Sequence, residues 1–201
     1  ERYNGSAPST PKPEFTNFKP KFKEVDMLDG LQPVSELNDD HPVRQYVVNR
    51  KIPSKYFSKL FLCNKFMTFV NKVKPGTFPH QKGEHPRLII PFYDINDKVF
   101  AFQGRAFGKE QPKYLTVKLD ENKQKVFGLE RVNLQQHIHI VEGPIDSLFI
   151  DNCLAAAGAD LTLRIEPSNV TYIFDNEPRN KEIIKRMYGV VEKDYNLVVW
   201  P

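Results

Sequence analysis

Two short acidic motifs follow β-branched or aromatic runs in the last third of the chain. Glu142 ends the run over residues 137–141, and Asp175 ends the run over residues 170–174. Such runs, bounded by Gly, Pro or Asn, are typical of buried strands. Carboxylates gathered in one place resist ionising unless a cation lies among them, and oxygen-only donors favour Mg²⁺ or Mn²⁺. These residues therefore predict a divalent-metal site.

The segment between the two runs is long enough for a crossover helix and a further strand, which we expect over residues 145–152 and 153–157. The resulting parallel βαβ arrangement places both acids at the carboxyl ends of neighbouring strands, the edge where open parallel sheets bind ligands. If the second strand continues, Asp175 and Glu177 face the same side. Asp146, at the start of the helix, is either a third acid of the site or a helix cap.

The remaining elements expected in this part are a turn, one helical turn, a helix beginning with Pro178 and a final strand, over residues 158–160, 161–165, 178–188 and 196–200. His137 and His139 alternate with isoleucines, so we interpret them as one face of a strand rather than as metal ligands.

Composition is ordinary for a soluble globular protein of 201 residues, with 40% hydrophobic and 27% charged residues. No apolar run approaches the roughly 18 residues that span a bilayer, and no secretion signal is visible. Cys63 and Cys153 lie too far apart in the sequence to form a zinc cluster by themselves. We expect both to be buried free thiols in an intracellular protein.

Charge is distributed unevenly. Residues 1–134 carry 23 Lys and Arg against 15 Asp and Glu, whereas residues 135–201 carry 6 against 10. A basic half followed by an acidic half suits a polyanion track that leads to a metal centre. Solvation of the surface by lysine explains the same imbalance equally well.

The first half contains a linker and two structured pieces. Residues 1–33 are rich in Pro, Lys and Ser, and we interpret them as a linker. Residues 41–62 predict two helices separated by a turn at Arg50, with Ser54 as the cap of the second helix. Residues 88–94 and 99–102 predict a β-hairpin, after which Gly104 would let the backbone approach a ligand closely.

These motifs carry a resemblance. Glu142-Gly143-x-x-Asp146-Ser147, followed by Asp175-x-Glu177, resembles the TOPRIM fold of bacterial-type primases, topoisomerases and some nucleases. The order of four further motifs is similar to bacterial-type DNA primases, and in particular to those of large tailed phages: Ile-Pro-Phe-x-Asp at 90–94, Phe-x-Gly-Arg at 102–105, Lys-Tyr-Leu at 113–115 and Phe-Gly-Leu at 127–129. The resemblance covers roughly residues 42–201.

The resemblance implies an α/β fold in which a TOPRIM parallel sheet flanked by helices, residues 135–201, follows a basic α+β subdomain, residues 34–134. It implies synthesis of short RNA primers from ribonucleotides on a single-stranded DNA template, a replicative helicase as partner and a location in the cytoplasm, or in the host cytoplasm for a phage protein. We expect an excised catalytic core, truncated at its carboxyl end, that primes poorly by itself.

The same resemblance implies the roles of individual residues. Glu142 would hold a metal or act in proton transfer, and Asp175 and Glu177 would hold Mg²⁺ or Mn²⁺ with Asp146 as a further acid. Residues expected to contact nucleotide or DNA are Arg50, Arg105 and Lys113 through phosphates and Tyr114 through stacking on a base. Tyr114 is equally interpreted as a packing residue, and Arg50 as a solvated turn residue.

The chain departs from the family's pattern in three places. Lys51 stands where the pattern has Gly, Asn176-Glu177 stand where it has Gly-Asp, and the cysteines of an amino-terminal zinc module are missing, so we expect no zinc site. Two other functions stay open. One is a TOPRIM nuclease or topoisomerase-type DNA-cleaving domain, and the other is a non-catalytic module that binds DNA or a helicase.

Overall fold

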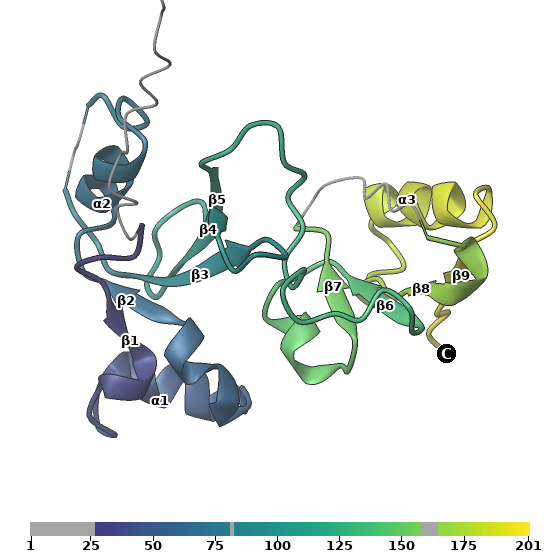
Figure 1. Ribbon diagram of the computed structural model, residues 1–201, viewed down its shortest axis with the longest axis horizontal. Helices are drawn as coiled ribbons and strands as arrows, with labels where there is room; N and C mark the ends of the chain where they lie inside the picture. Colours follow the sequence, from purple (N-terminus) through teal and green to yellow (C-terminus); the bar gives the residue numbers. More distant parts are fainter. Residues whose placement is uncertain (1–26, 81–82, 158–164) are drawn as a thin grey trace, which may run out of the picture.

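The computed structural model describes residues 27–80, 83–157 and 165–201. Within these residues the chain forms a five-stranded antiparallel sheet, in the order β1-β2-β3-β4-β5, and a four-stranded parallel sheet, in the order β7-β6-β8-β9. The two sheets follow one another along the long axis of the molecule (Figure 1). The predicted α/β class with a parallel sheet is confirmed.

The antiparallel sheet consists of β1 (Gln32–Pro33), β2 (Phe61–Cys63), β3 (Arg87–Tyr93), β4 (Val99–Ala106) and β5 (Tyr114–Lys118). The predicted hairpin is confirmed, because β3 and β4 pair in antiparallel register. Asp94 organises its turn by accepting hydrogen bonds from the backbone N–H groups of Asn96 and Lys98. Most of the predicted linker lies outside the described residues, but its last two residues form β1 at the edge of this sheet.

Helix α1 (Pro42–Asn49) begins with proline in its first turn and is capped by the His41 side chain. The chain leaves it through Lys51, whose φ of 58° lies in the left-handed region that favours glycine. This conformation explains why the family's pattern has Gly at the position. The second predicted helix is instead a 3₁₀ helix, Ser54–Lys59, preceded by Pro53. Ser54 does not cap it, so that expectation is wrong.

Helix α2 (Phe66–Val73) was not predicted. Its buried residues Phe66, Phe69 and Val70 recur at helical spacing, which was the available signal. The cap comes from a distant residue, since the Glu84 carboxylate accepts hydrogen bonds from the N–H groups of Met67 and Thr68.

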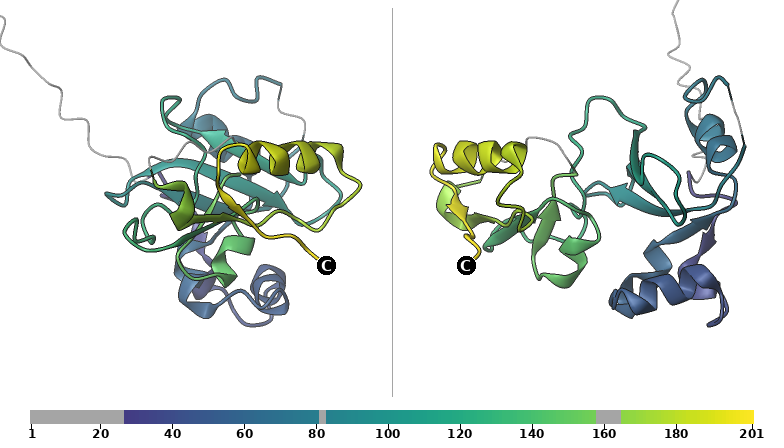
Figure 2. Two further views of the ribbon diagram at one scale, coloured as in Figure 1. Left: turned by 90° about the vertical axis from the view of Figure 1, so that its right-hand side faces the viewer. Right: turned by 180° about the vertical axis from the view of Figure 1, so that it is seen from behind.

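The parallel sheet consists of β6 (Ile138–Val141), β7 (Cys153–Ala155), β8 (Val170–Tyr172) and β9 (Asn196–Leu197), and α3 (Lys181–Val191) covers one of its faces (Figure 2). The helix expected over residues 145–152 is only a 3₁₀ turn, Asp146–Phe149. Asn152 has a φ of 47°, which ends the segment in a tight turn before β7. The turn and the helical turn were expected over residues 158–165. All of these residues except the last lie outside the described part of the chain.

One apolar core joins the two sheets. Val34, Leu88 and Phe92 of the first part belong to the same buried cluster as Leu148 and Ala155 of the second. A backbone bridge adds to this, because Phe127 and Ala155 exchange hydrogen bonds of 2.9 and 3.0 Å. The shared core fixes the carboxyl edge of the parallel sheet against the antiparallel sheet. Both cysteines are buried free thiols, as predicted.

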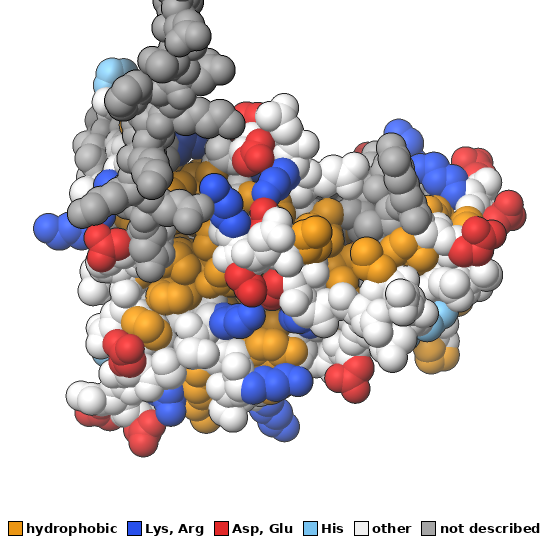
Figure 3. Space-filling view, viewed as in Figure 1, with side chains coloured by type: hydrophobic (Ala, Val, Ile, Leu, Met, Phe, Trp, Pro, Cys, Tyr) orange, Lys and Arg blue, Asp and Glu red, His pale blue; other side chains and the backbone are white. Residues whose placement is uncertain are grey.

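Charged side chains of both signs are interspersed on the face drawn in Figure 3, so the predicted basic track is not continuous on that face. None of the helices formed by the described residues has the length and apolar content to cross a membrane.

Candidate active site

A cavity of about 520 Å³ lies where β6 and β8 end. The parallel pairing of these strands places the segments that follow them next to one another, as the sequence predicted. Six of the predicted site residues line the cavity: Arg50, Tyr114, Glu142, Asp146, Asp175 and Glu177. The antiparallel sheet supplies Tyr114 and the turn after α1 supplies Arg50, so the cavity is built from both parts of the fold.

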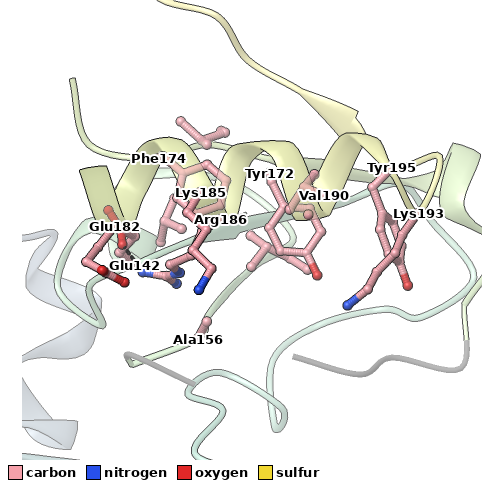
Figure 4. A pocket seen from close by; sticks show the side chains of 14 residues that line it. Glu142, Ala156, Tyr172, Phe174, Glu182, Lys185, Arg186, Val190, Lys193 and Tyr195 are labelled. Atoms are coloured by element: carbon pink, nitrogen blue, oxygen red, sulfur yellow. Dashed lines mark hydrogen bonds and ion pairs between the residues drawn. The ribbon is translucent and has the colours of Figure 1, made fainter. Parts of the chain in front are cut away.

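Glu142 is held at both carboxylate oxygens. Its Oε1 atom accepts a hydrogen bond from the Arg186 guanidinium on α3, and its Oε2 atom accepts one of 3.2 Å from the backbone N–H of Asp175. Figure 4 shows Glu142 and Arg186 pointing toward one another beside a second cavity, of about 550 Å³, which continues along α3. Glu142 thus ties together the end of β6, the segment after β8 and α3.

The loop that carries Asp146 is held in place by hydrogen bonds of the next residue, Ser147. Ser147 is fully buried; its hydroxyl donates to the Pro144 carbonyl at 2.7 Å and accepts from Arg131 at the same distance. The Asp146 carboxylate lies over Gly143, where an added Cβ atom would fall 2.1 Å from Oδ2. The small residue of the Glu-Gly pair therefore makes room for the second acid.

The segment after β8 does not continue as a strand. Glu177 N–H donates to the Asp175 carbonyl at 2.8 Å, which is a tight turn, and the Glu177 carboxylate accepts from the Asn180 side chain at 2.8 Å. The expectation that Asp175 and Glu177 share one face of a strand is wrong. Asn180 also caps α3 through the N–H groups of Glu182 and Ile183, which explains why the helix begins later than predicted.

The charges of the cavity support a cation there. Partial burial, followed by the nearby carboxylates of Glu142, Asp146 and Glu177, raises the pKa of Asp175. Burial also raises the pKa of Asp146, and Arg50 offsets this in part. A divalent cation would relieve this repulsion. One observation opposes a preformed metal site. The described residues contain no cluster of three or more acid, His or Cys side chains already in position to bind a metal. The donor chemistry fits a hard cation, although the ligands would have to rearrange around it.

The comparisons with known proteins extend the likeness to nearly the whole chain. The DNA primase of Enterobacteria phage T4 is 36% identical over 192 residues, which is 94% of this chain and 56% of that protein. The chain is related to DNA primases. It spans only about half the length of that primase, and no protein-family model matches it.

Solved primase structures share the fold. The zinc-binding and RNA polymerase domains of the Aquifex aeolicus primase match with a TM-score of 0.60 at 19% identity, over 81% of this chain and 50% of that one. A primase catalytic domain bound to single-stranded DNA matches with a TM-score of 0.52 at 17% identity, over 80% and 63% of the respective chains. The predicted resemblance to the catalytic core of bacterial and phage primases is confirmed.

Two residues of the predicted primase groove do not line the cavity. Arg105 is buried, and its guanidinium lies 4.1 Å from the centre of the Tyr46 ring and 5.7 Å from that of Phe107. Lys113 is exposed outside the cavity lining. Gly104 does not open the backbone to a ligand. Its missing side chain makes room for the Phe66 ring, 2.4 Å from where a Cβ would lie.

Several residues of the candidate site were missed by sequence reasoning. Arg186, Asn180, Gln103 and Glu182 line the cavity, and Arg131 supports its floor. For Arg186 and Glu182 a signal existed, because their spacing of four places them on one face of the predicted helix. Nothing in the local sequence indicates that Arg131 reaches Ser147, 16 residues away.

Proposed function

We propose that this chain is the catalytic core of a DNA primase, which synthesises short RNA primers from ribonucleotides on single-stranded DNA with the help of Mg²⁺ or Mn²⁺. The observation that carries the proposal is the cavity in which Arg50, Tyr114 and the four carboxylates meet. The relationship to the phage T4 primase supports the reaction class.

The cavity offers separate groups for separate parts of the substrate. Arg50 presents a planar fork of N–H donors that suits phosphate oxygens, and it lies on the rim next to the acids. Tyr114, of which 40% is exposed, presents a ring on which a base can stack. The acids and these two residues face one space, so phosphate, base and cation would be held together.

Asp146, Asp175 and Glu177 are the oxygen donors that would hold the cation. When bound, the cation would lower the pKa of an attacking primer hydroxyl and neutralise charge that develops on the phosphoryl oxygens. Glu142 orients the backbone of Asp175 through its Oε2 atom, so one carboxylate positions the next. In the proposed role the protein contributes position and electrostatics more than covalent chemistry.

The proposal extends to partners. We infer that single-stranded DNA and ribonucleoside triphosphates bind at the cavity, and that a replicative helicase is a partner of the complete protein. The fold neighbour solved with single-stranded DNA bound supports the binding of single-stranded DNA.

Calorimetric titration with Mn²⁺ tests the metal site in the chain as it is. The parent should bind, and Asp175→Asn should lose at least about tenfold in affinity, because it removes a carboxylate at the centre of the cluster. Asp151→Asn is the matched control, since Asp151 is exposed outside the cavity lining. If neither the parent nor the control binds Mn²⁺, the catalytic proposal fails and a non-catalytic binding module becomes the better function.

A priming assay on single-stranded template then tests the reaction. With ribonucleotides and Mn²⁺, the parent should give primers at a low rate, and Asp175→Asn should give none. Nicking or relaxation of supercoiled DNA by the parent, with no primers formed, would instead favour the cleaving enzymes of the same fold.

A further inference from the structure

Arg186 forms an ion pair with Glu142 that the sequence motifs do not include. The arginine comes from the middle of α3, more than forty residues after the glutamate, and reaches the end of β6. Figure 4 shows that Glu182, one helical turn earlier, lies on the same side of α3. The helix therefore presents a cation to the carboxylate that ends β6.

The pair is partly withdrawn from water. The Glu142 side chain is 19% exposed and that of Arg186 is 29% exposed. The guanidinium also lies 5.2 Å from the centre of the Phe174 ring, so one of its faces is covered. Ion pairs in such surroundings are screened less than those on the surface, and removal of one partner leaves the other uncompensated.

Both oxygens of Glu142 already have donors, Arg186 on one side and the Asp175 N–H on the other. To coordinate a cation, Glu142 would have to give up at least one of these bonds. The adjacent guanidinium would in addition repel the cation. Two of the other carboxylates are held more loosely: Asp146 makes only an ion pair of 3.9 Å with Arg50, and Glu177 accepts a hydrogen bond from the neutral side chain of Asn180.

We propose that Arg186 is a positioning residue that keeps Glu142 oriented and outside the metal coordination shell. The inference rests on the proposed metal site and assigns different roles to its carboxylates. Asp146, Asp175 and Glu177 bind the cation. Glu142, held by Arg186, sets the position of the Asp175 backbone.

A double-mutant cycle read by Mn²⁺ calorimetry tests this assignment. Arg186→Gln should bind Mn²⁺ about tenfold more tightly than the parent, because Glu142 becomes available as a further ligand. Glu142→Gln alone should change the affinity by less than about threefold, since the residue is not a ligand. In the Glu142→Gln background the gain from Arg186→Gln should shrink to its electrostatic part, because removal of the guanidinium still relieves its repulsion of the cation.

Arg179→Gln is the control for net charge, because Arg179 is an exposed cation just before α3 that lies outside the cavity lining. The gain in Arg179→Gln shows how much affinity follows from the loss of one positive charge near the site. A gain from Arg186→Gln that is as large in the Glu142→Gln background as in the parent would be electrostatic and would overturn the assignment. So would a loss of at least about tenfold in Glu142→Gln, which would make Glu142 a metal ligand.

Circular dichroism checks that each variant is folded. Arg186→Lys, which keeps the charge but not the planar fork, is the second variant, and it should bind Mn²⁺ with an affinity between those of the parent and Arg186→Gln. An affinity equal to that of the parent in both folded variants overturns the inference while the metal site stands. Absence of Mn²⁺ binding in the parent overturns the proposed function itself.

Discussion

The Nη2 atom of Arg50 lies 3.9 Å from Oδ1 of Asp146, and this contact joins the turn after α1 to the acidic loop after β6. The side chains are 39% and 52% exposed, and the distance is at the outer limit of an ion pair. Such a pair contributes little to stability. The guanidinium is therefore available to a phosphate group.

We expect Arg50→Gln to change the free energy of unfolding by less than about 0.5 kcal/mol and to weaken binding of single-stranded DNA. The slope of log affinity against log salt concentration should fall by about one, as for the loss of one phosphate contact. Urea denaturation and fluorescence anisotropy with a labelled oligonucleotide measure the two effects.

Lys72→Gln is the matched control for Arg50→Gln. Lys72 makes an equally loose ion pair of 3.8 Å with Asp29, away from the cavity. If both variants weaken DNA binding to the same extent, the effect of Arg50 reflects net charge alone.

Removal of the Arg105 side chain should lower stability, whereas removal of the Lys113 side chain should weaken DNA binding. Arg105 is 8% exposed and packs on Tyr46 and Phe107, so Arg105→Ala should lower the free energy of unfolding by about 2 kcal/mol. Lys113→Ala should stay within about 0.5 kcal/mol of the parent and weaken DNA binding in a salt-dependent way. Chemical denaturation and anisotropy at two salt concentrations separate these effects. If Arg105→Ala is as stable as the parent, the stacking of Arg105 on Tyr46 and Phe107 contributes nothing to the free energy of unfolding.

The carboxyl edge of the parallel sheet was predictable because it depends on local patterns. Apolar runs that end in Glu142 and Asp175 specify strands, and parallel strands bring their ends together whatever the details between them. The hairpin over β3 and β4 was predictable for a similar reason, since its turn residues lie next to one another in the sequence.

The rest depends on contacts between distant residues. Glu84 caps α2 from outside the helix, Arg131 reaches Ser147, and Arg186 reaches Glu142. Arg105 was predicted as a groove residue, but its burial follows from packing against α1, which no spacing within β4 reveals. Sequence patterns located the acids, whereas the groups that orient them required the structure.

Gly143→Ala should displace the Asp146 carboxylate, because the new Cβ would fall 2.1 Å from its Oδ2 atom. Gly143 is not among the residues with positive φ, so the backbone accepts alanine and the side chain of Asp146 must move. If Asp146 helps to bind the cation, Mn²⁺ affinity should fall roughly tenfold in calorimetry.

Gly189→Ala is the control for Gly143→Ala. Gly189 lies inside α3 with open space where its Cβ would be, so alanine should raise stability by about 0.5–1 kcal/mol and leave Mn²⁺ affinity unchanged. Unchanged Mn²⁺ affinity in Gly143→Ala as well would remove Asp146 from the metal site.

Asp175→Asn should stabilise the metal-free protein at pH 7. Burial and the neighbouring carboxylates raise the pKa of Asp175 above its ordinary value of 3.8, so its ionised form is disfavoured in the folded state. That cost is absent below pH 3.8, grows as the pH rises through the raised pKa and is constant above it. The gain from Asp175→Asn in denaturation experiments should therefore shrink as the pH is lowered from 7 toward 4.

Saturating Mn²⁺ should make the parent more stable than Asp175→Asn, which is the reverse of their order without metal. At a free concentration of 100 times the dissociation constant, binding stabilises the parent by about 2.7 kcal/mol, and the variant should gain far less. Asp151→Asn, at an exposed position outside the cavity lining, should follow the parent under both conditions. If the stability difference between parent and Asp175→Asn instead depends on neither pH nor Mn²⁺, the Asp175 carboxylate is not repelled by its neighbours' charge and does not bind the cation.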